Sequence, residues 1–156
     1  MPNIKIICIG SLKERWLSQA QAEYAKRLSA FCRLTIIEKK ECALPKNASA
    51  AQTQKALLEE GDALLSACSG SVIALSPEGE TLSSEAFSAL VRKLSDAGDV
   101  SFVTGGSNGL SEPLKQKAQR VVSFSALTMP HQLFRIVLLE QIYRAFMIAS
   151  GRTYHK

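Results

Sequence analysis

The stretch of the chain that decides the fold is DVSFVT at 99–104, which runs directly into GGSNG at 105–109. The first part predicts a short buried strand, and the second a glycine-rich turn that leads from a strand into a helix. Similar units are expected on both sides of it. We expect strands at 3–9, 34–38, 71–75, 99–104 and 120–124, and helices at 14–31, 49–67, 85–97 and 130–150, with a short helix beginning at Ser111. This alternation predicts a single α/β domain over residues 1–156, built on a mostly parallel sheet flanked by helices.

The carboxyl ends of three of these strands are the expected ligand site, because open α/β sheets bind ligands there. The segments are Leu75–Gly79, in which Ser76–Gly79 is expected to be a turn, the glycine turn at 105–109, and the loop at 123–129. Known phosphate motifs do not fit, since the spacing is GGxxG rather than GxGxxG and no GxxxxGK[ST] occurs. No GxSxG hydrolase motif is present either. By itself, GGxxG favours a tight strand-to-helix turn over a ligand loop.

The composition excludes several classes of protein. The 156 residues are 46% hydrophobic and 21% charged, which suits a folded domain rather than a disordered or fibrous chain. The longest strictly aliphatic run is Ile136–Leu139, far short of the ~20 apolar residues of a membrane span. The start, MPNIKIICIG, lacks the pattern of a signal peptide. The four cysteines, at 8, 32, 42 and 68, show no metal-ligand spacing, so we expect a cytoplasmic protein with reduced thiols and no metal.

The net charge of +5 is unevenly distributed. Residues 113–156 hold seven bases and one acid, a net charge of +6, whereas residues 1–112 hold 12 bases and 13 acids, a net charge of −1. A basic segment fits a polyanionic partner such as nucleic acid, because cations that neutralise phosphates release counterions. A solvated surface explains the same charges equally well.

The helix expected at 130–150 is apolar on nearly all sides. From Leu133 to Ala149, 13 of 17 residues are apolar, and such a helix must be buried on most of its faces. We therefore expect a homodimer whose interface covers it. Glu140 and Arg144 are spaced for an i, i+4 ion pair. For Arg135 and Arg144 we expect pairing with the other subunit rather than contact with RNA.

Three stretches resemble a known family: LSPEGETLSSEAF at 75–87, GGSNGL at 105–110, and SFSALTMPHQLFRIVLLEQIYRAFMIASGRTYHK at 123–156. Together they resemble the ribosomal RNA large subunit methyltransferase H family, small bacterial enzymes of the SPOUT, or α/β-knot, methyltransferase class. The similarity extends from the first strand to the last residue, and the run from Thr128 to Lys156 is its specific part.

The resemblance implies S-adenosylmethionine-dependent methylation of N3 of a pseudouridine in large-subunit (23S) rRNA on the assembled ribosome. It also implies a homodimer and a C-terminal trefoil knot, which general topology rules alone count against. The turn at 76–80 departs from the family, which often carries a basic residue there. The cofactor positions that the resemblance implies fall on the three strand-end segments: Leu75, Gly105, Gly106, Phe124, Ser125, Ala126, Leu127, Thr128 and Met129.

The resemblance also places an active-site tail at Tyr154, His155 and Lys156. We expect His155 to assist loss of the N3 proton of the pseudouridine, as a base or as a hydrogen-bond acceptor. Tyr154 is expected to orient the base or to stack on it. Lys156 and Arg152 are expected to hold phosphate or to stabilise charge on a carbonyl oxygen. By position alone, a frayed terminus explains these residues too. His131 is expected to be a structural residue at the helix start or a contact near the cofactor.

Two other functions stay open at this point. One is a small nucleotide-dependent α/β enzyme that acts on metabolites, and the other is a non-catalytic ribosome-binding factor. Calorimetric titration with S-adenosylmethionine separates these classes, because a protein that does not bind it is not this kind of methyltransferase.

Overall fold

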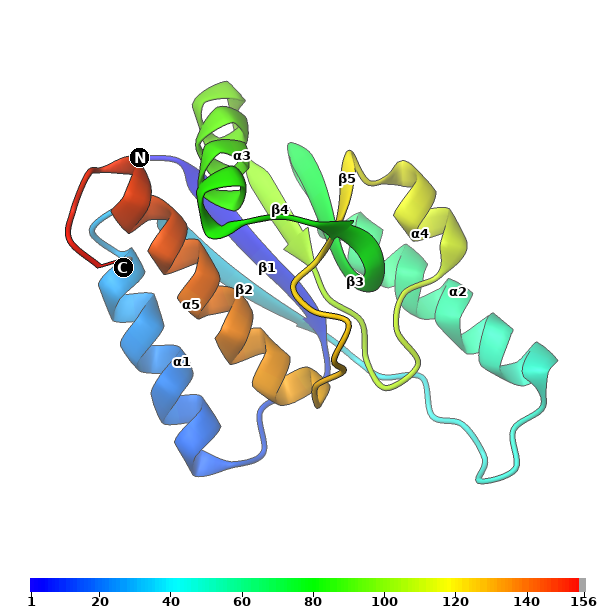
Figure 1. Ribbon diagram of the computed structural model, residues 1–156. Coiled ribbons are helices and arrows are strands. Elements are labelled where there is room, and N and C mark those ends of the chain that lie inside the picture. The colour runs from blue at the N-terminus through cyan, green and yellow to red at the C-terminus, as the bar shows by residue number, and fades with distance from the viewer. Residues whose placement is uncertain (155–156) are drawn as a thin grey trace.

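Strands and helices alternate along the whole chain in the computed structural model, which describes residues 1–154 (Figure 1). The expected alternation is therefore confirmed, and most boundaries agree with the prediction to within about three residues. In chain order the elements are β1 (Asn3–Ile9), α1 (Arg15–Leu28), β2 (Arg33–Lys39), α2 (Ala50–Ser66), β3 (Ser71–Thr81), α3 (Ser84–Ala97), β4 (Val100–Val103), α4 (Glu112–Lys117), β5 (Arg120–Ser123) and α5 (His131–Ala149).

The strands form a five-stranded sheet in the order β2-β1-β4-β3-β5. Every neighbouring pair is parallel, as in the register Ile6↔Phe102 between β1 and β4 and Ile73↔Phe102 between β3 and β4. The mostly parallel sheet is thus confirmed. Because all strands run in the same direction, their carboxyl ends lie toward one edge, where the loops after β4 and β5 meet residues 75–77 of β3.

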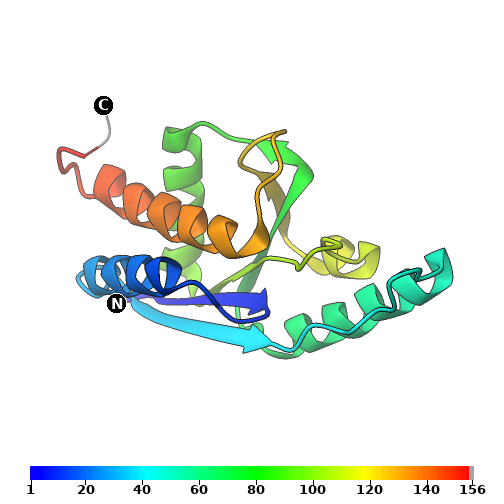
Figure 2. The same cartoon turned by 90° about the horizontal axis from the view of Figure 1, so that it is seen from below.

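Helices cover both faces of this sheet (Figures 1 and 2). Alternate strand side chains point to opposite faces, so Ile6 and Phe102 join the core under α1, α3 and α5. Their neighbours Ile7 and Val103 join a second core, with Leu64 of α2 and Leu114 of α4. Burial on both faces explains why the strands are apolar runs rather than alternating patterns.

Serine caps begin three of the helices. The side chain of Ser49 accepts a hydrogen bond from the Gln52 N–H, and the Gln52 side chain accepts one from the Ser49 N–H, which completes a capping box on α2. Ser83 caps α3, and Ser111 caps α4. The sequence offers Asn47 or Ser49 as the cap of this helix, and the structure shows that Ser49 is the cap.

The prediction that a turn at Ser76–Gly79 ends the third strand is wrong. The strand β3 continues to Thr81, and both Leu75 and Glu80 take Val122 of β5 as their partner. The residues between them form an excursion from the ladder, after which the chain returns to the same strand. Turn-forming residues are present, but their effect is a bulge rather than a stop.

The long helix α5 packs between α1 and α3 of its own chain (Figure 1). Its buried residues include Leu138, Leu139 and Ile142, each 0% exposed. Neighbouring helices therefore cover much of the surface for which an interface was expected. Seven further apolar residues of the helix stay only partly covered: Leu133, Phe134, Ile136, Val137, Tyr143, Phe146 and Ile148.

The expectation that Arg135 pairs with the other subunit is wrong, because its side chain is buried inside its own chain. Its side chain is 1% exposed and pairs with Glu38 of β2 at 2.6 Å. It also donates to the carbonyl oxygen of Gly10 at 2.9 Å and to Oε1 of Gln21 at 3.4 Å. Arg135 thus joins α5 to β2, to α1 and to the end of β1 within one chain.

The four cysteines all lie among the described residues and are free, as expected. Cys8 and Cys32 are buried, and burial raises the pKa of the Cys8 thiol to about 11 and that of Cys32 to about 12. Across residues 1–154, no helix is long and apolar enough to cross a membrane.

Candidate functional site

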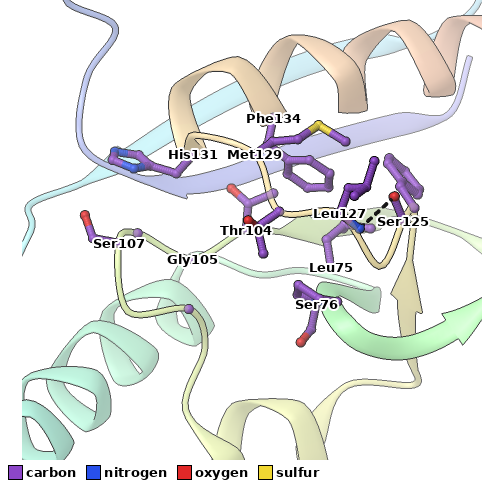
Figure 3. Close-up of a pocket in the computed structure, with 15 residues that line it drawn as sticks. Leu75, Ser76, Thr104, Gly105, Ser107, Ser125, Leu127, Met129, His131 and Phe134 are labelled. Atoms are coloured by element: carbon purple, nitrogen blue, oxygen red, sulfur yellow. Dashed lines mark hydrogen bonds between the residues drawn. The ribbon is translucent and has the colours of Figure 1, made fainter.

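A pocket of about 260 Å³ opens at the carboxyl edge of the sheet, where the three predicted strand-end segments meet (Figure 3). Leu75 and Ser76 at the β3 bulge lie on one side, and Met129 and Phe134 lie on the other (Figure 3). The glycine turn closes a third side. Fifteen residues line the pocket: Leu75, Ser76, Pro77, Thr104, Gly105, Gly106, Ser107, Gly109, Phe124, Ser125, Leu127, Thr128, Met129, His131 and Phe134.

Eight of the nine predicted cofactor residues are in this lining. The ninth, Ala126, belongs to the same loop but is exposed and is not part of the lining. The residues that sequence reasoning did not place in the site include Thr104 and Phe134. Phe134 follows the pocket residue His131 by three positions, so a helical-face argument from His131 could have found it.

The loop 124–129 is held in shape by its own serines. The Leu127 N–H donates to Oγ of Ser125 at 2.9 Å, and the Ser123 hydroxyl donates to the Ser125 carbonyl oxygen at 3.1 Å. This shape leaves the Leu127 side chain 79% exposed at the rim of the pocket. An exposed apolar side chain at a pocket rim suits contact with a bound ligand or partner.

The glycine turn needs glycine at Gly105 for steric reasons. A Cβ atom there would lie 2.3 Å from the carbonyl oxygen of Gly109, which itself has a φ of +78°. Gly106 and Gly109 form an isolated bridge across the turn, and the Ser107 hydroxyl donates to Glu41 at 3.3 Å. The turn therefore brings backbone close to the pocket without side chains that would fill it.

The chemistry of the lining suits a nucleoside. Leu75, Phe124 and Met129 offer apolar surface, while the backbone of the glycine turn and of loop 124–129 offers N–H and C=O groups. Pockets for small molecules measure roughly 300–1,000 Å³ and combine such apolar walls with a few polar groups. The volume here matches the lower end of that range. A wider hollow adjoins it and shares Gly106, Ser107, Thr128, Met129 and His131.

Comparison with known proteins identifies the family. A family model described as "Predicted SPOUT methyltransferase" matches residues 2–155. The chain belongs to the SPOUT methyltransferase family. A protein named ribosomal RNA large subunit methyltransferase H, from Leuconostoc mesenteroides, is 46% identical over 158 aligned positions, which cover 99% of each chain.

Solved structures resemble this SPOUT methyltransferase in fold. A probable methylase family protein from Haemophilus influenzae matches with a TM-score of 0.58 at 15% identity, over 98% of this chain and 70% of that one. A methyltransferase from Legionella pneumophila, in complex with bound SAM, matches with a TM-score of 0.50 at 15% identity, over 93% of this chain and 66% of that one.

Of the predicted active-site tail, only Tyr154 falls within the described part of this SPOUT methyltransferase; His155 and Lys156 lie outside it. The Tyr154 hydroxyl donates to Glu140 at 2.5 Å, and the guanidinium of Arg144 lies 4.8 Å from its ring centre. The hydrogen bond to Glu140 and burial raise the pKa of Tyr154 to about 12. Tyr154 therefore lies against the middle of α5, outside the lining of the pocket.

Four of the seven bases of the C-terminal segment are paired inside the chain. Lys115 pairs with Glu78 and Glu112, Arg120 with Glu80, Arg135 with Glu38, and Arg144 with Glu140. Most of the local charge of +6 is thus compensated by acids from elsewhere in the fold. Charge patterning alone had left a nucleic-acid surface and a solvated surface as equal alternatives, and for these four bases the structure shows intramolecular pairing.

The described residues hold no group of three or more histidine, cysteine, aspartate or glutamate side chains placed to bind a metal ion. Among residues 1–154, the pocket lining holds one ionisable side chain, His131, beside hydroxyl groups and backbone. Apart from His131, this lining offers neutral polar and apolar groups to a ligand.

Proposed function

We propose that this SPOUT methyltransferase transfers the methyl group of S-adenosylmethionine to N3 of a pseudouridine in large-subunit rRNA on the assembled ribosome. The relative at 46% identity over nearly the full length carries the rRNA part of this proposal in its name. The observation that carries the chemistry is the pocket, in which the bulge of β3, the glycine turn after β4 and the loop after β5 converge on one cavity. Such a substrate places the enzyme in the cytoplasm, with residues 1–156 acting as one domain.

The pocket residues fit the proposed methyl donor. Backbone groups of Gly105, Gly106 and loop 124–129 would hold the adenine and ribose, and the apolar side chains of Leu75, Phe124 and Met129 would pack against the adenine. The donor supplies an electrophilic methyl group on a sulfonium. Methyl transfer is an in-line displacement, so positioning of the two reactants can supply a large part of the barrier reduction, up to ~7–11 kcal/mol in well-oriented systems.

The N3 imide of the target base must lose a proton before or during attack. In this proposal His155 accepts the proton and Tyr154 orients the base. Lys156 and Arg152 contact phosphate or a carbonyl oxygen of the base. Tyr154 must leave Glu140 for this role, because in the described conformation its hydroxyl is engaged there. Tyr154 lies beside Glu140, nine residues after the pocket residue His131, so it is about 14 Å along α5 from the pocket end of the helix.

This separation is one reason to keep the homodimer in the proposal. A second subunit brings a second tail and covers the apolar residues of α5 that stay partly exposed. The trefoil knot implied by the family stays a prediction. Sedimentation at micromolar concentration tests the dimer, and a monomeric coefficient would remove it.

Calorimetric titration with S-adenosylmethionine tests the proposed function at the pocket. We expect saturable binding, and a protein without it would be a ribosome-binding factor or an enzyme of another kind. His155→Ala tests the tail: we expect unchanged cofactor binding with a large loss of kcat. A kcat equal to that of the wild type on saturating ribosomes would remove the catalytic role of His155.

A further inference from the structure

One wall of the pocket is not held by the sheet. Ser76 and Pro77 line the pocket, yet they belong to the excursion of β3 between Leu75 and Glu80, where the ladder with β5 is interrupted. A segment without ladder partners is free to shift unless other contacts fix it. The position of this wall therefore depends on what holds residues 76–79.

Side-chain contacts to α4 and β5 hold the excursion. The Lys115 ammonium lies 2.8 Å from Glu78 and 2.8 Å from Glu112, so it bridges the excursion to the first turn of α4. Beyond the excursion, Arg120 pairs with Glu80 at 2.6 Å. The backbone at Gly79 lies so close to β5 that a Cβ atom there would be 2.7 Å from the carbonyl group of Val121.

Lys115 is the most enclosed member of this set. Its side chain is 13% exposed, whereas those of Glu78 and Glu112 are 75% and 70% exposed. The carboxylates of Glu78 and Glu112 compensate the positive charge of this largely enclosed ammonium group. Their hydrogen bonds raise the pKa of Lys115, and the same contact lowers that of Glu78.

The helix that carries Lys115 is itself firmly anchored. Leu114, the preceding residue, is 0% exposed in the second core, and Ser111 caps the helix. A lysine on a fixed helix, bound to a carboxylate on an otherwise unpaired segment, acts as a brace for that segment. None of these residues touches the cavity itself.

We propose that Lys115 is a positioning residue for the methyl donor: by bridging Glu78 and Glu112, it fixes the wall that Ser76 and Pro77 form. This inference rests on the proposed function, since it concerns the affinity of the pocket for S-adenosylmethionine. It also gives the acidic sequence Ser-Pro-Glu-Gly-Glu of this chain a purpose, because its carboxylates hold the wall in place.

The test is calorimetric titration of S-adenosylmethionine, without ribosomes, into Lys115→Met. We expect Kd to rise about fivefold, at the upper end of what exposed pairs reach, because the lysine is enclosed and bridges two acids. With saturating donor and ribosomes, kcat stays within about twofold of the wild type. Lys115→Arg keeps the bridge and restores the wild-type Kd. The difference in Kd between the wild type and Lys115→Met should decrease as the salt concentration rises, because salt screens the ion pairs.

Two controls separate this role from others. Lys117→Met removes an exposed lysine of the same helix that has no ion pair in residues 1–154, and its Kd should equal that of the wild type. Glu78→Gln changes an exposed side chain, keeps the fold, and should raise Kd as Lys115→Met does. The double variant should be no worse than either single variant, because both remove one contact.

The outcomes that overturn the inference are distinct from those that overturn the proposed function. A wild-type protein that fails to bind S-adenosylmethionine rejects both. Wild-type binding with an unchanged Kd in Lys115→Met and Glu78→Gln rejects the positioning role alone. An unchanged Kd together with a raised KM for ribosomes would make Lys115 an RNA contact instead.

Discussion

The buried pair of Arg135 and Glu38 makes an asymmetric prediction about stability. Arg135 is 1% exposed, but the side chain of Glu38 is 42% exposed. Glu38→Ala leaves a buried guanidinium whose remaining acceptors within residues 1–154 are the neutral groups of Gly10 and Gln21. Arg135→Met leaves a carboxylate that water can reach. We therefore expect Glu38→Ala to lower the free energy of unfolding more than Arg135→Met does, although Glu38 is the smaller and more exposed residue.

The magnitudes follow from these exposures. Removing one partner of a buried pair costs about 3–5 kcal/mol when the remaining charge is uncompensated, so we expect this range for Glu38→Ala. Nε of Arg135 already lacks a hydrogen-bond partner within residues 1–154, so few contacts remain to stabilise the buried guanidinium once Glu38 is removed. For Arg135→Met we expect about 1–2 kcal/mol, mainly from the lost hydrogen bond to Gly10. The double variant should be more stable than Glu38→Ala alone.

Urea unfolding followed by circular dichroism measures these differences, at one protein concentration so that any dimerisation contributes equally. The matched control is Glu23→Ala, which removes the exposed pair between Glu23 and Arg27 and should cost about 0.5 kcal/mol or less. If Glu38→Ala costs no more than Arg135→Met, or if the double variant is as unstable as Glu38→Ala, the burial argument is wrong.

Three further predictions concern the turn, a cap and the thiols. Gly105→Ala should weaken S-adenosylmethionine binding about tenfold in calorimetry, because its Cβ would overlap the Gly109 carbonyl oxygen; unchanged affinity would remove the turn from the site. Ser49→Ala should lower the free energy of unfolding by about 1 kcal/mol through loss of the capping box, read from urea curves. At pH 8 a thiol reagent should modify half-buried Cys42 well before Cys8 and Cys32, whose pKa values of about 11 and about 12 keep them protonated. As pH rises above about 9 the same two thiols ionise more readily in the unfolded chain, so the free energy of unfolding should fall, and a flat profile between pH 8 and 10 would contradict this.

Local sequence signals located most of the fold. Local signals predicted one cap at Asn47 or Ser49 and another at Ser83 or Ser84, and the structure uses Ser49 and Ser83. The apolar runs marked strands buried on both faces. The error at Ser76–Gly79 is of a different kind. Its turn residues are real local signals, but the return of Glu80 to Val122 depends on a strand 40 residues further along the chain. Pattern reasoning has no access to that pairing.

The site shows the same division between local and distant information. The strand-end rule and the family resemblance placed Leu75, the glycine turn and the loop 124–129, and the structure brings these segments together. The burial of Arg135 and the bracing role of Lys115 could not be predicted, because their partners Glu38 and Glu78 lie 97 and 37 residues away.

The central claim is that the pocket carries methyl transfer to ribosomal RNA. Transfer of a labelled methyl group from S-adenosylmethionine to assembled ribosomes, compared with free rRNA, tests it most directly. We expect stoichiometric incorporation into large-subunit rRNA of assembled ribosomes, at N3 of one pseudouridine, and little into free rRNA. No incorporation into either, by a protein that is folded and binds the donor, would contradict the account.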